Sequence, residues 1–243
     1  MHMGYYVKVE PNVKVYVEDL NPDGKKTIVF LHGWPGNHNL FEYQFNQLPK
    51  LGYRCIGIDQ RGFGKSDKPY GGYDYDRLSD DVRCVVNGLR LHDFILAGHS
   101  TGGAIAIRYM SRHKGYGVSK LALFASAAPS LIKRPNFPYG LEKEDVIKII
   151  EGTYTDRPKM LSDFGDTFFF QHISKPFSDL AEINVPTLII HGIHDKVVPF
   201  QLGKVQNQSI RNSKLLPFEF SGHASFYDQR DRFNEELVKF IEE

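Results

Sequence analysis

Cysteine is scarce in this chain of 243 residues, which contains only Cys55 and Cys84. Two cysteines cannot build the disulfide framework that stabilises many small secreted domains. Both lie in apolar or helix-like surroundings, which is typical of buried free thiols. We therefore expect a cytoplasmic protein from a reducing compartment, stabilised by a hydrophobic core and not by covalent bridges.

Long apolar runs are also absent, since no segment approaches the roughly 20 apolar residues that a membrane-spanning helix requires. The first residues, Met1–Tyr5, lack the apolar core of a secretory signal. The net charge is +1, with no block of either sign, whereas nucleic-acid binding requires a concentrated cationic face. These absences predict a protein that binds neither nucleic acid nor a membrane.

Two cofactor signatures are missing as well. No Gly-x-Gly-x-x-Gly segment follows the first strands and opens a helix, which argues against a dinucleotide-binding fold. His191 and His194 are three residues apart, but a metal site needs three or four converging ligands. We therefore expect no metal and no cofactor.

Along most of the chain, apolar runs alternate with segments of helical periodicity. Tyr6–Val9 and Val13–Val17 flank a turn and predict an antiparallel β-hairpin at one edge of a sheet. The alternation that follows predicts an α/β architecture with a mostly parallel sheet, right-handed crossover connections and helices on both faces of the sheet. The predicted strands cover 27–31, 54–58, 94–97, 120–124 and 186–190, and the predicted helices cover 40–51, 76–91, 101–113 and 226–243.

This alternation stops between residues 127 and 180. Two helices are predicted there, over Leu141–Glu151 and Lys159–Phe170. We interpret the segment as a short helical cap inserted into a single domain that spans residues 1–243. Packing of its aromatic residues against the main domain is compatible with that role, because a cap must be anchored.

The Gly-x-Ser-x-Gly motif at residues 98–102 carries the strongest functional signal. An apolar run at 94–97 precedes it and a helix-like apolar segment follows, which is the context of a nucleophile elbow. Its glycines lack a Cβ and allow strand and helix to approach closely. We expect Ser100 to stand above the sheet beside a helix N-terminus, where negative charge is favoured.

A nucleophilic serine needs a base, and the base needs a carboxylate that orients it. Asp195 follows the apolar run 186–190, where open α/β sheets place residues of their sites. Taken alone, Asp195 is equally well explained as a turn residue that bonds its own backbone. His223 follows the short run 218–220. The order serine, acid, histidine, with each residue at a strand end, predicts the triad Ser100, Asp195 and His223.

These three residues, together with His32–Gly36 and Asp59–Ser66, resemble the α/β-hydrolase superfamily. Within it the chain is most similar to the branch of non-haem haloperoxidases and aryl esterases, from about Val13 to the C-terminus. The resemblance implies the α/β-hydrolase fold and a carboxylesterase that acts on small esters, such as aryl esters or lactones. Perhydrolysis is implied as a side activity. Relatives of this type usually carry a longer cap, so this cap is reduced.

The resemblance also implies an oxyanion hole that is built from the backbone N–H groups of Trp34 and Thr101. Many relatives have methionine where Thr101 stands, a change that keeps the backbone donor. We expect a small-molecule ester as the partner, and a homo-oligomer is compatible with the sequence. Aromatic residues are the candidates for the substrate pocket, with core packing as the competing interpretation: Trp34, Phe124, Phe137, Phe168 and Phe226.

Several polar residues are expected to support the site. His32, His99 and His191 lie beside motif glycines and are interpreted as hydrogen-bonded supports, not as catalysts. Asp59 and Arg61 are predicted to form a buried charge pair that fixes the turn before Gly62.

Two other functions stay open at this point. A carbon–carbon bond hydrolase of the same fold keeps the serine and usually acts on larger aromatic acids. A ligand-binding or weakly active scaffold with a shortened cap is the non-enzymatic alternative. Haloalkane dehalogenases carry aspartate at the elbow, so Ser100 argues against that reaction.

Overall fold

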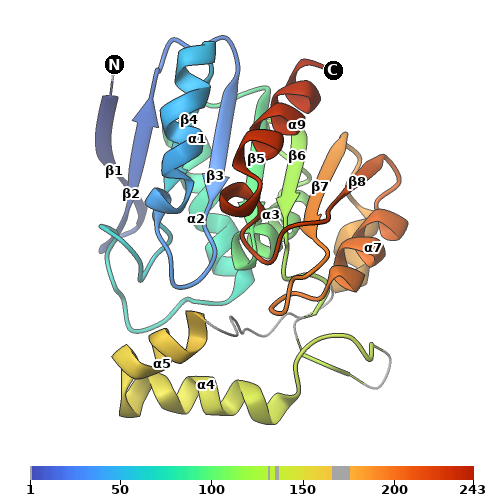
Figure 1. The fold of residues 1–243 in the computed structure, drawn as a ribbon. Helices are drawn as coiled ribbons and strands as arrows, with labels where there is room; N and C mark the ends of the chain where they lie inside the picture. Colours follow the sequence, from blue (N-terminus) through green and yellow to red (C-terminus); the bar gives the residue numbers. More distant parts are fainter. Residues whose placement is uncertain (1, 131, 135–136, 166–175) are drawn as a thin grey trace.

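The computed structural model describes residues 2–130, 132–134, 137–165 and 176–243. Its centre is one eight-stranded sheet with the strand order β1-β2-β4-β3-β5-β6-β7-β8 (Figure 1). The strands are β1 (His2–Glu10), β2 (Val13–Leu20), β3 (Thr27–Leu31), β4 (Arg54–Ile58), β5 (Phe94–His99), β6 (Val118–Phe124), β7 (Thr187–Gly192) and β8 (Ser213–Phe218).

Strand pairing confirms the mostly parallel sheet. β1 and β2 form the predicted antiparallel hairpin at the edge, and β2 also pairs antiparallel with β4. All pairs from β4 to β8 are parallel, so their carboxyl ends meet at one edge of the sheet. Residues at those ends can therefore form one site although they are far apart in sequence.

Helices cover both faces of the sheet, as expected. α2 and α3 lie behind it in the view of Figure 1, and α1 and α9 lie in front. The helices of the main domain are α1 (Glu42–Gln47), α2 (Tyr75–Gly88), α3 (Thr101–Arg112), α7 (Phe200–Ser209), α8 (Ser225–Asp228) and α9 (Arg230–Glu242), with short 3₁₀ helices η1 (His38–Phe41) and η2 (Leu48–Leu51).

Alternate residues of each strand belong to different hydrophobic clusters. In β3, Val29 and Leu31 pack in the cluster that contains residues of α2 and α3. Ile28 and Phe30 pack in the cluster that contains residues of α9. Because both faces of the sheet are covered, the central strands are apolar along nearly their whole length.

Three helical segments differ from the expectation. The predicted helix at 40–51 is divided into η1, α1 and η2, and Pro49, which has no N–H to donate, lies in η2. The terminal helix is divided at Gln229 into α8 and α9. α7 was not predicted from the sequence. The face of α9 is as predicted, because it buries Phe233, Leu237, Phe240 and Ile241.

The segment between β6 and β7 contains α4 (Lys143–Thr155), α5 (Arg157–Gly165) and α6 (Pro176–Ala181). α4 and α5 lie beyond the carboxyl ends of the parallel strands, at the bottom of Figure 1. Val146 and Met160 are buried in a cluster with Val198 and Leu202, which anchors both helices to the main domain. The end of the predicted helix 159–170 falls outside the described residues.

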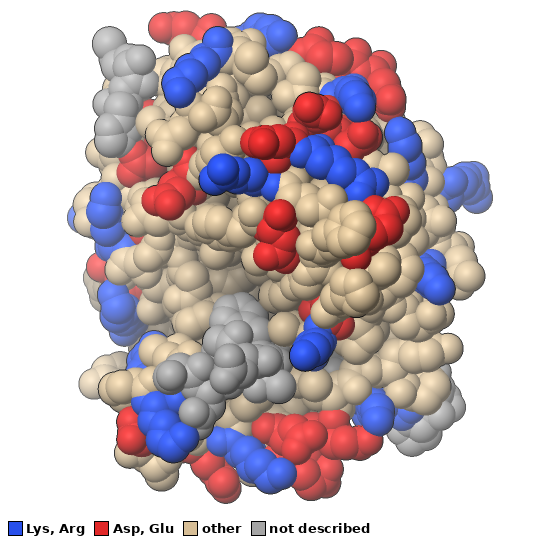
Figure 2. Space-filling view, viewed as in Figure 1, with Lys and Arg blue, Asp and Glu red and all other residues tan. Residues whose placement is uncertain are grey.

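Charged residues are interspersed on the surface, and Figure 2 shows positive and negative side chains mixed over the face that it displays. Cys55 is buried, Cys84 is half-buried, and both are free thiols, as expected. Within the described ranges, no helix combines the length and the apolar character needed to cross a membrane.

The predicted pair of Asp59 and Arg61 is wrong. The guanidinium of Arg61 bonds both carboxylate oxygens of Asp81 on α2, at 2.6 and 2.7 Å, and reaches Glu10 at 2.6 Å. Asp59 instead accepts hydrogen bonds from the backbone and ring of His38, both at 2.8 Å. Adjacency in sequence suggested the pair, but the loop directs the two side chains to different elements.

Replacing Arg61 with alanine is expected to destabilise the protein by about 3 kcal/mol, because the buried carboxylate of Asp81 loses its bidentate partner and keeps only the hydrogen bond from Arg77. Lys239→Ala is the control, since Lys239 is exposed and its ion pair with Glu236 contributes little. Urea unfolding of the wild type, Arg61→Ala and Lys239→Ala measures the differences in the free energy of unfolding. Equal midpoints for Arg61→Ala and Lys239→Ala would contradict this account of the buried network.

Candidate active site

Ser100 stands in a strained turn between β5 and α3. Its backbone has φ 53° and ψ −119°, a conformation that costs a non-glycine residue free energy. The strand and the helix approach each other closely at this turn, because glycines at the contact have no Cβ. A Cβ on Gly98 would lie 2.5 Å from the carbonyl oxygen of Gly102, and one on Gly102 would overlap the carbonyl of Leu31. This geometry is that of the nucleophile elbow.

The backbone of Ser100 is fixed, whereas its hydroxyl is not engaged. Its N–H donates to the carbonyl of Phe124 at 3.0 Å, and its carbonyl accepts N–H bonds from Gly103, Ala104 and Ala127. Its Oγ is enclosed and has no hydrogen-bond partner in the part of the chain that the structure describes. The hydroxyl is therefore held in position with its own hydrogen-bonding capacity unused.

Asp195 follows β7 and is buried. One carboxylate oxygen, Oδ1, accepts the N–H groups of Val197 and Val198 at 2.8 and 2.9 Å. The other, Oδ2, lies 2.8 Å from Nδ1 of His223. Asp195 therefore bonds its own turn and also bonds the imidazole, so the two interpretations of the sequence are compatible.

The electrostatics keep Asp195 ionised. Burial acts to raise the pKa of its carboxyl, but the charge of His223 and hydrogen bonds from His191 and His223 outweigh burial and hold the pKa well below its ordinary value. An ionised carboxylate can only accept, so Nδ1 of His223 must be the donor. The other ring nitrogen, Nε2, is then the atom that can accept a proton.

His223 is also tied to the elbow. The ring of His99, the residue before Ser100, donates from Nε2 to the carbonyl of His223 at 3.0 Å. The two rings lie 4.6 Å apart, and the ring of Phe226 packs against His99 at 4.9 Å. Burial, followed by the charge of His223, lowers the pKa of His99 well below its ordinary value, so His99 is a neutral support.

The other two supporting histidines also make the expected hydrogen bonds. His32 donates from Nδ1 to the carbonyl of Gly33 at 2.9 Å and accepts the N–H of Gln60 on Nε2 at 3.0 Å. Its burial lowers its pKa to about 4. His191 donates from Nε2 to the carbonyl of Val198 at 2.8 Å. Gln60 was not predicted, although its place directly after the strand-end Asp59 was a signal.

The two predicted oxyanion donors are in contact with each other. The N–H of Thr101, at the start of α3, makes no hydrogen bond within the described ranges. Helix N-termini leave such donors unpaired and favour negative charge. The N–H of Trp34 donates to the side-chain oxygen Oγ1 of Thr101 at 2.9 Å. The sequence predicted a role for the backbone N–H of Thr101 and none for its hydroxyl.

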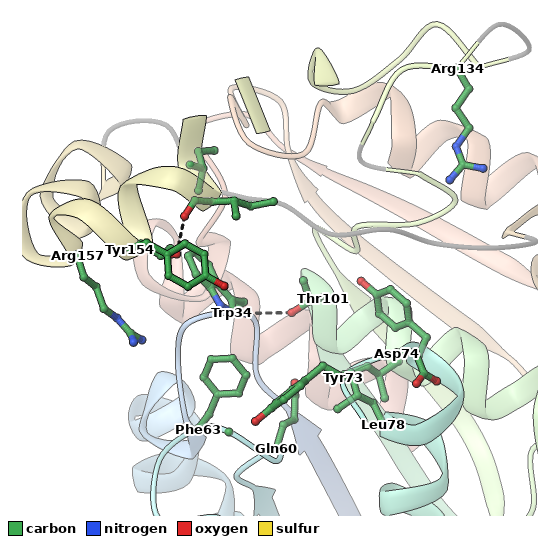
Figure 3. Close-up of a pocket in the computed structure, with 16 residues that line it drawn as sticks. Trp34, Gln60, Phe63, Tyr73, Asp74, Leu78, Thr101, Arg134, Tyr154 and Arg157 are labelled. Carbon is green, nitrogen blue, oxygen red and sulfur yellow. Dashed lines mark hydrogen bonds between the residues drawn. The ribbon is translucent and has the colours of Figure 1, made fainter. Parts of the chain in front are cut away.

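A cavity of about 1020 Å³ opens beside these two residues (Figure 3). Trp34 and Thr101 face each other along one wall, where the dashed line in Figure 3 marks their hydrogen bond. The rest of the lining comes from the segment after β4, from α2 and α3, and from α4 and α5. Its apolar and aromatic members include Phe63, Tyr73, Tyr75, Leu78, Ile105, Ile149, Ile150 and Tyr154.

Among the predicted pocket residues, Trp34 lines this cavity. Phe124 and Phe226 are buried in the core beside Phe41, so core packing is what the structure assigns to them. Phe137 is buried in the cluster beneath the inserted helices. Phe168 lies outside the described residues. Within the described ranges, no group of three or more histidine, cysteine or acidic side chains is arranged to hold a metal ion.

The model of the alpha/beta hydrolase fold family matches residues 26–156. The AB hydrolase superfamily protein YisY of Bacillus subtilis (strain 168) is 44% identical over 267 residues, which covers 98% of this chain and 99% of the relative. The esterase EaEST from Exiguobacterium antarcticum has a TM-score of 0.93 at 40% identity, with 99% and 100% of the two chains covered. A bromoperoxidase from Bacillus anthracis has a TM-score of 0.91 at 30% identity, with the same coverage.

The family model covers more than half of the chain, and the relatives match it along nearly its whole length. The resemblance drawn from the sequence is thereby confirmed. The protein belongs to the α/β hydrolase fold family, on the branch that holds esterases and haloperoxidases.

Proposed function

We propose that this member of the α/β hydrolases is a serine carboxylesterase for small esters, with aryl esters and lactones as its substrate classes. The observation that carries the proposal is the 2.8 Å contact between Nδ1 of His223 and Oδ2 of Asp195. His223 is also hydrogen-bonded to His99, the residue directly before the strained Ser100. The similarity to a structure named as an esterase supports the same reaction.

In the proposed acylation, Nε2 of His223 removes the hydroxyl proton of Ser100 while Oγ forms a bond to the ester carbonyl carbon. The carbonyl π electrons move to oxygen and form the tetrahedral oxyanion. When that intermediate collapses, the bond to the leaving alkoxide breaks, and the alkoxide takes the proton from His223. Asp195 stabilises the imidazolium that exists between the two proton transfers.

Deacylation repeats these steps with water. His223 takes a proton from water, the oxygen bonds to the acyl carbon, and the bond to Ser100 breaks as Oγ recovers its proton. Hydrogen peroxide in place of water gives a peracid by the same route, without haem or metal. We propose this perhydrolysis as the side activity, and the similarity to a bromoperoxidase supports it.

The cavity supports an ester with an apolar or aryl group. It adjoins the proposed oxyanion donors Trp34 and Thr101 and is lined by the rings of Phe63 and Tyr73. Pockets for small molecules usually combine such apolar walls with few polar groups. The cavity has a volume of about 1020 Å³, which can hold a group much larger than acetate. The size of the cavity therefore does not restrict the substrate to a small aryl group.

We propose that residues 127–180 form a reduced cap over this site, within one domain. The placement of α4 and α5 beyond the carboxyl ends of the strands supports a cap. The alignment with YisY is longer than the chain of 243 residues, so that relative contains residues without a counterpart here, which supports a reduction.

Replacing Ser100 with alanine is expected to lower kcat for a short-chain 4-nitrophenyl ester by about 10⁴-fold or more, because the nucleophile is lost. Ser111→Ala, a serine removal on the same helix, should keep the wild-type rate. A fluorophosphonate probe should label the wild-type protein and Ser111→Ala but not Ser100→Ala. Undiminished turnover by Ser100→Ala would overturn the proposed function.

The activity is expected to rise with pH over about pH 5 to 8, where histidines lose their proton, because the base must be neutral to accept a proton. The lowered pKa of Asp195 keeps its carboxylate ionised over this range, so it should add no second inflection. Asp195→Asn should lower kcat by about 10⁴-fold. A flat profile of kcat/KM between pH 5 and 9 would rule out a histidine base.

A further inference from the structure

The side chain of Thr101 occupies the place where the backbone of Trp34 was expected to act. An oxyanion donor must point its hydrogen at the reacting oxygen, but the N–H of Trp34 points at Oγ1 of Thr101, 2.9 Å away. The dashed bond in Figure 3 spans the wall of the cavity at this point. The hydroxyl of Thr101 therefore engages the N–H group that was expected to bind the oxyanion.

The hydrogen bonds of Thr101 leave one proton unassigned. A hydroxyl has one donor and two acceptor positions, and the N–H of Trp34 fills an acceptor position. Threonine in a helix often donates to a carbonyl of the preceding turn. No such bond, and no other acceptor for this proton, occurs within the part of the chain that the structure describes.

Thr101 is 6% exposed, and it lines the cavity. Buried polar groups nearly always have a hydrogen-bond partner. The unassigned proton and the unpaired N–H belong to the same residue, the one directly after Ser100. Both are donors, and both lie at the N-terminus of α3, where negative charge is favoured.

We propose that the hydroxyl of Thr101 is itself a catalytic oxyanion donor. Trp34 N–H holds Oγ1, and the Oγ1–H group and the backbone N–H of Thr101 together bond the oxyanion. This inference rests on the proposed esterase function and replaces one of its two donors. In a chain of hydrogen bonds each bond polarises the next, so the N–H of Trp34 still acts on the oxyanion through the hydroxyl.

Two features preorganise this donor. Threonine is branched at Cβ and has few rotamers available, which limits the cost of ordering it. The bond from Trp34 then fixes Oγ1 before substrate arrives, and preorganised donors need no rearrangement when charge develops. Such a pair of donors favours a substrate whose carbonyl oxygen becomes negative during the reaction. The carbonyl oxygen of an ester or lactone does so when the nucleophile attacks.

The test compares Thr101→Val, which removes the hydroxyl and keeps the shape, with Thr101→Ser, which keeps the hydroxyl. Loss of one oxyanion donor lowers kcat by about 10²–10³-fold, so this loss is expected for valine with KM little changed. Serine should keep most of the wild-type kcat for the same 4-nitrophenyl ester. Thr101→Ala serves as the second hydroxyl-free variant should valine not fold.

If the hydroxyl only blocks the N–H of Trp34, valine will match or exceed the wild-type kcat, and the inference is overturned. A wild-type protein that neither hydrolyses esters nor takes a fluorophosphonate would overturn the proposed function as well. An active, labelled wild type with an equally active valine variant overturns only the role of Thr101.

A crystal structure of the wild-type protein with a phosphonate on Ser100 gives a readout that needs no variant. The phosphoryl oxygen should lie at about 2.5–3.0 Å from Oγ1 of Thr101, within range of a hydroxyl hydrogen bond. Direct contact of that oxygen with the N–H of Trp34, with the hydroxyl of Thr101 turned away, would overturn the inference.

Discussion

The positive φ of Ser100 is the constraint on which the rest of the site depends. A serine adopts this conformation only when the surrounding structure enforces it. Here the enforcement comes from direct contact of β5 with α3 at Gly98 and Gly102, inside a core that is covered on both faces. The sharp turn brings the hydroxyl of Ser100 and the free N–H of Thr101 onto adjacent residues, so the proposed nucleophile and the proposed oxyanion donor are positioned by the same turn.

The charges around the elbow are arranged so that one imidazole can exchange a proton. Burial lowers the pKa of His32 and His99, which act as hydrogen-bonded supports. Asp195 stays ionised because its partners outweigh the effect of burial. Among the histidines that the structure describes, His223 combines a carboxylate on one nitrogen with a ring contact to His99 beside the elbow. In the account proposed above, the supporting histidines hold this geometry and His223 carries the chemistry.

Local patterns predicted much of this fold. A strand that is covered on both faces must be apolar along its length, and a helix that buries one face has apolar residues at helical spacing, as Phe233 to Ile241 show. Strand ends likewise indicated Asp195 and His223, which the structure brings into contact. Side-chain contacts between segments that are far apart in the chain could not be predicted from local sequence patterns. Arg61 bonds Asp81 and not Asp59, and Thr101 bonds Trp34 through its hydroxyl, because each partner depends on how a loop turns in space.

In the proposed reaction an acyl group forms on Ser100, and trapping that group is the sharpest test of the proposal. Wild-type protein would be mixed with an excess of a slowly hydrolysed 4-nitrophenyl ester, quenched in acid during turnover, digested and analysed by mass spectrometry. The added acyl mass is expected on the peptide that contains Ser100. An acyl group on a different residue, or release of nitrophenol with no covalent intermediate, would rule out Ser100 as the nucleophile.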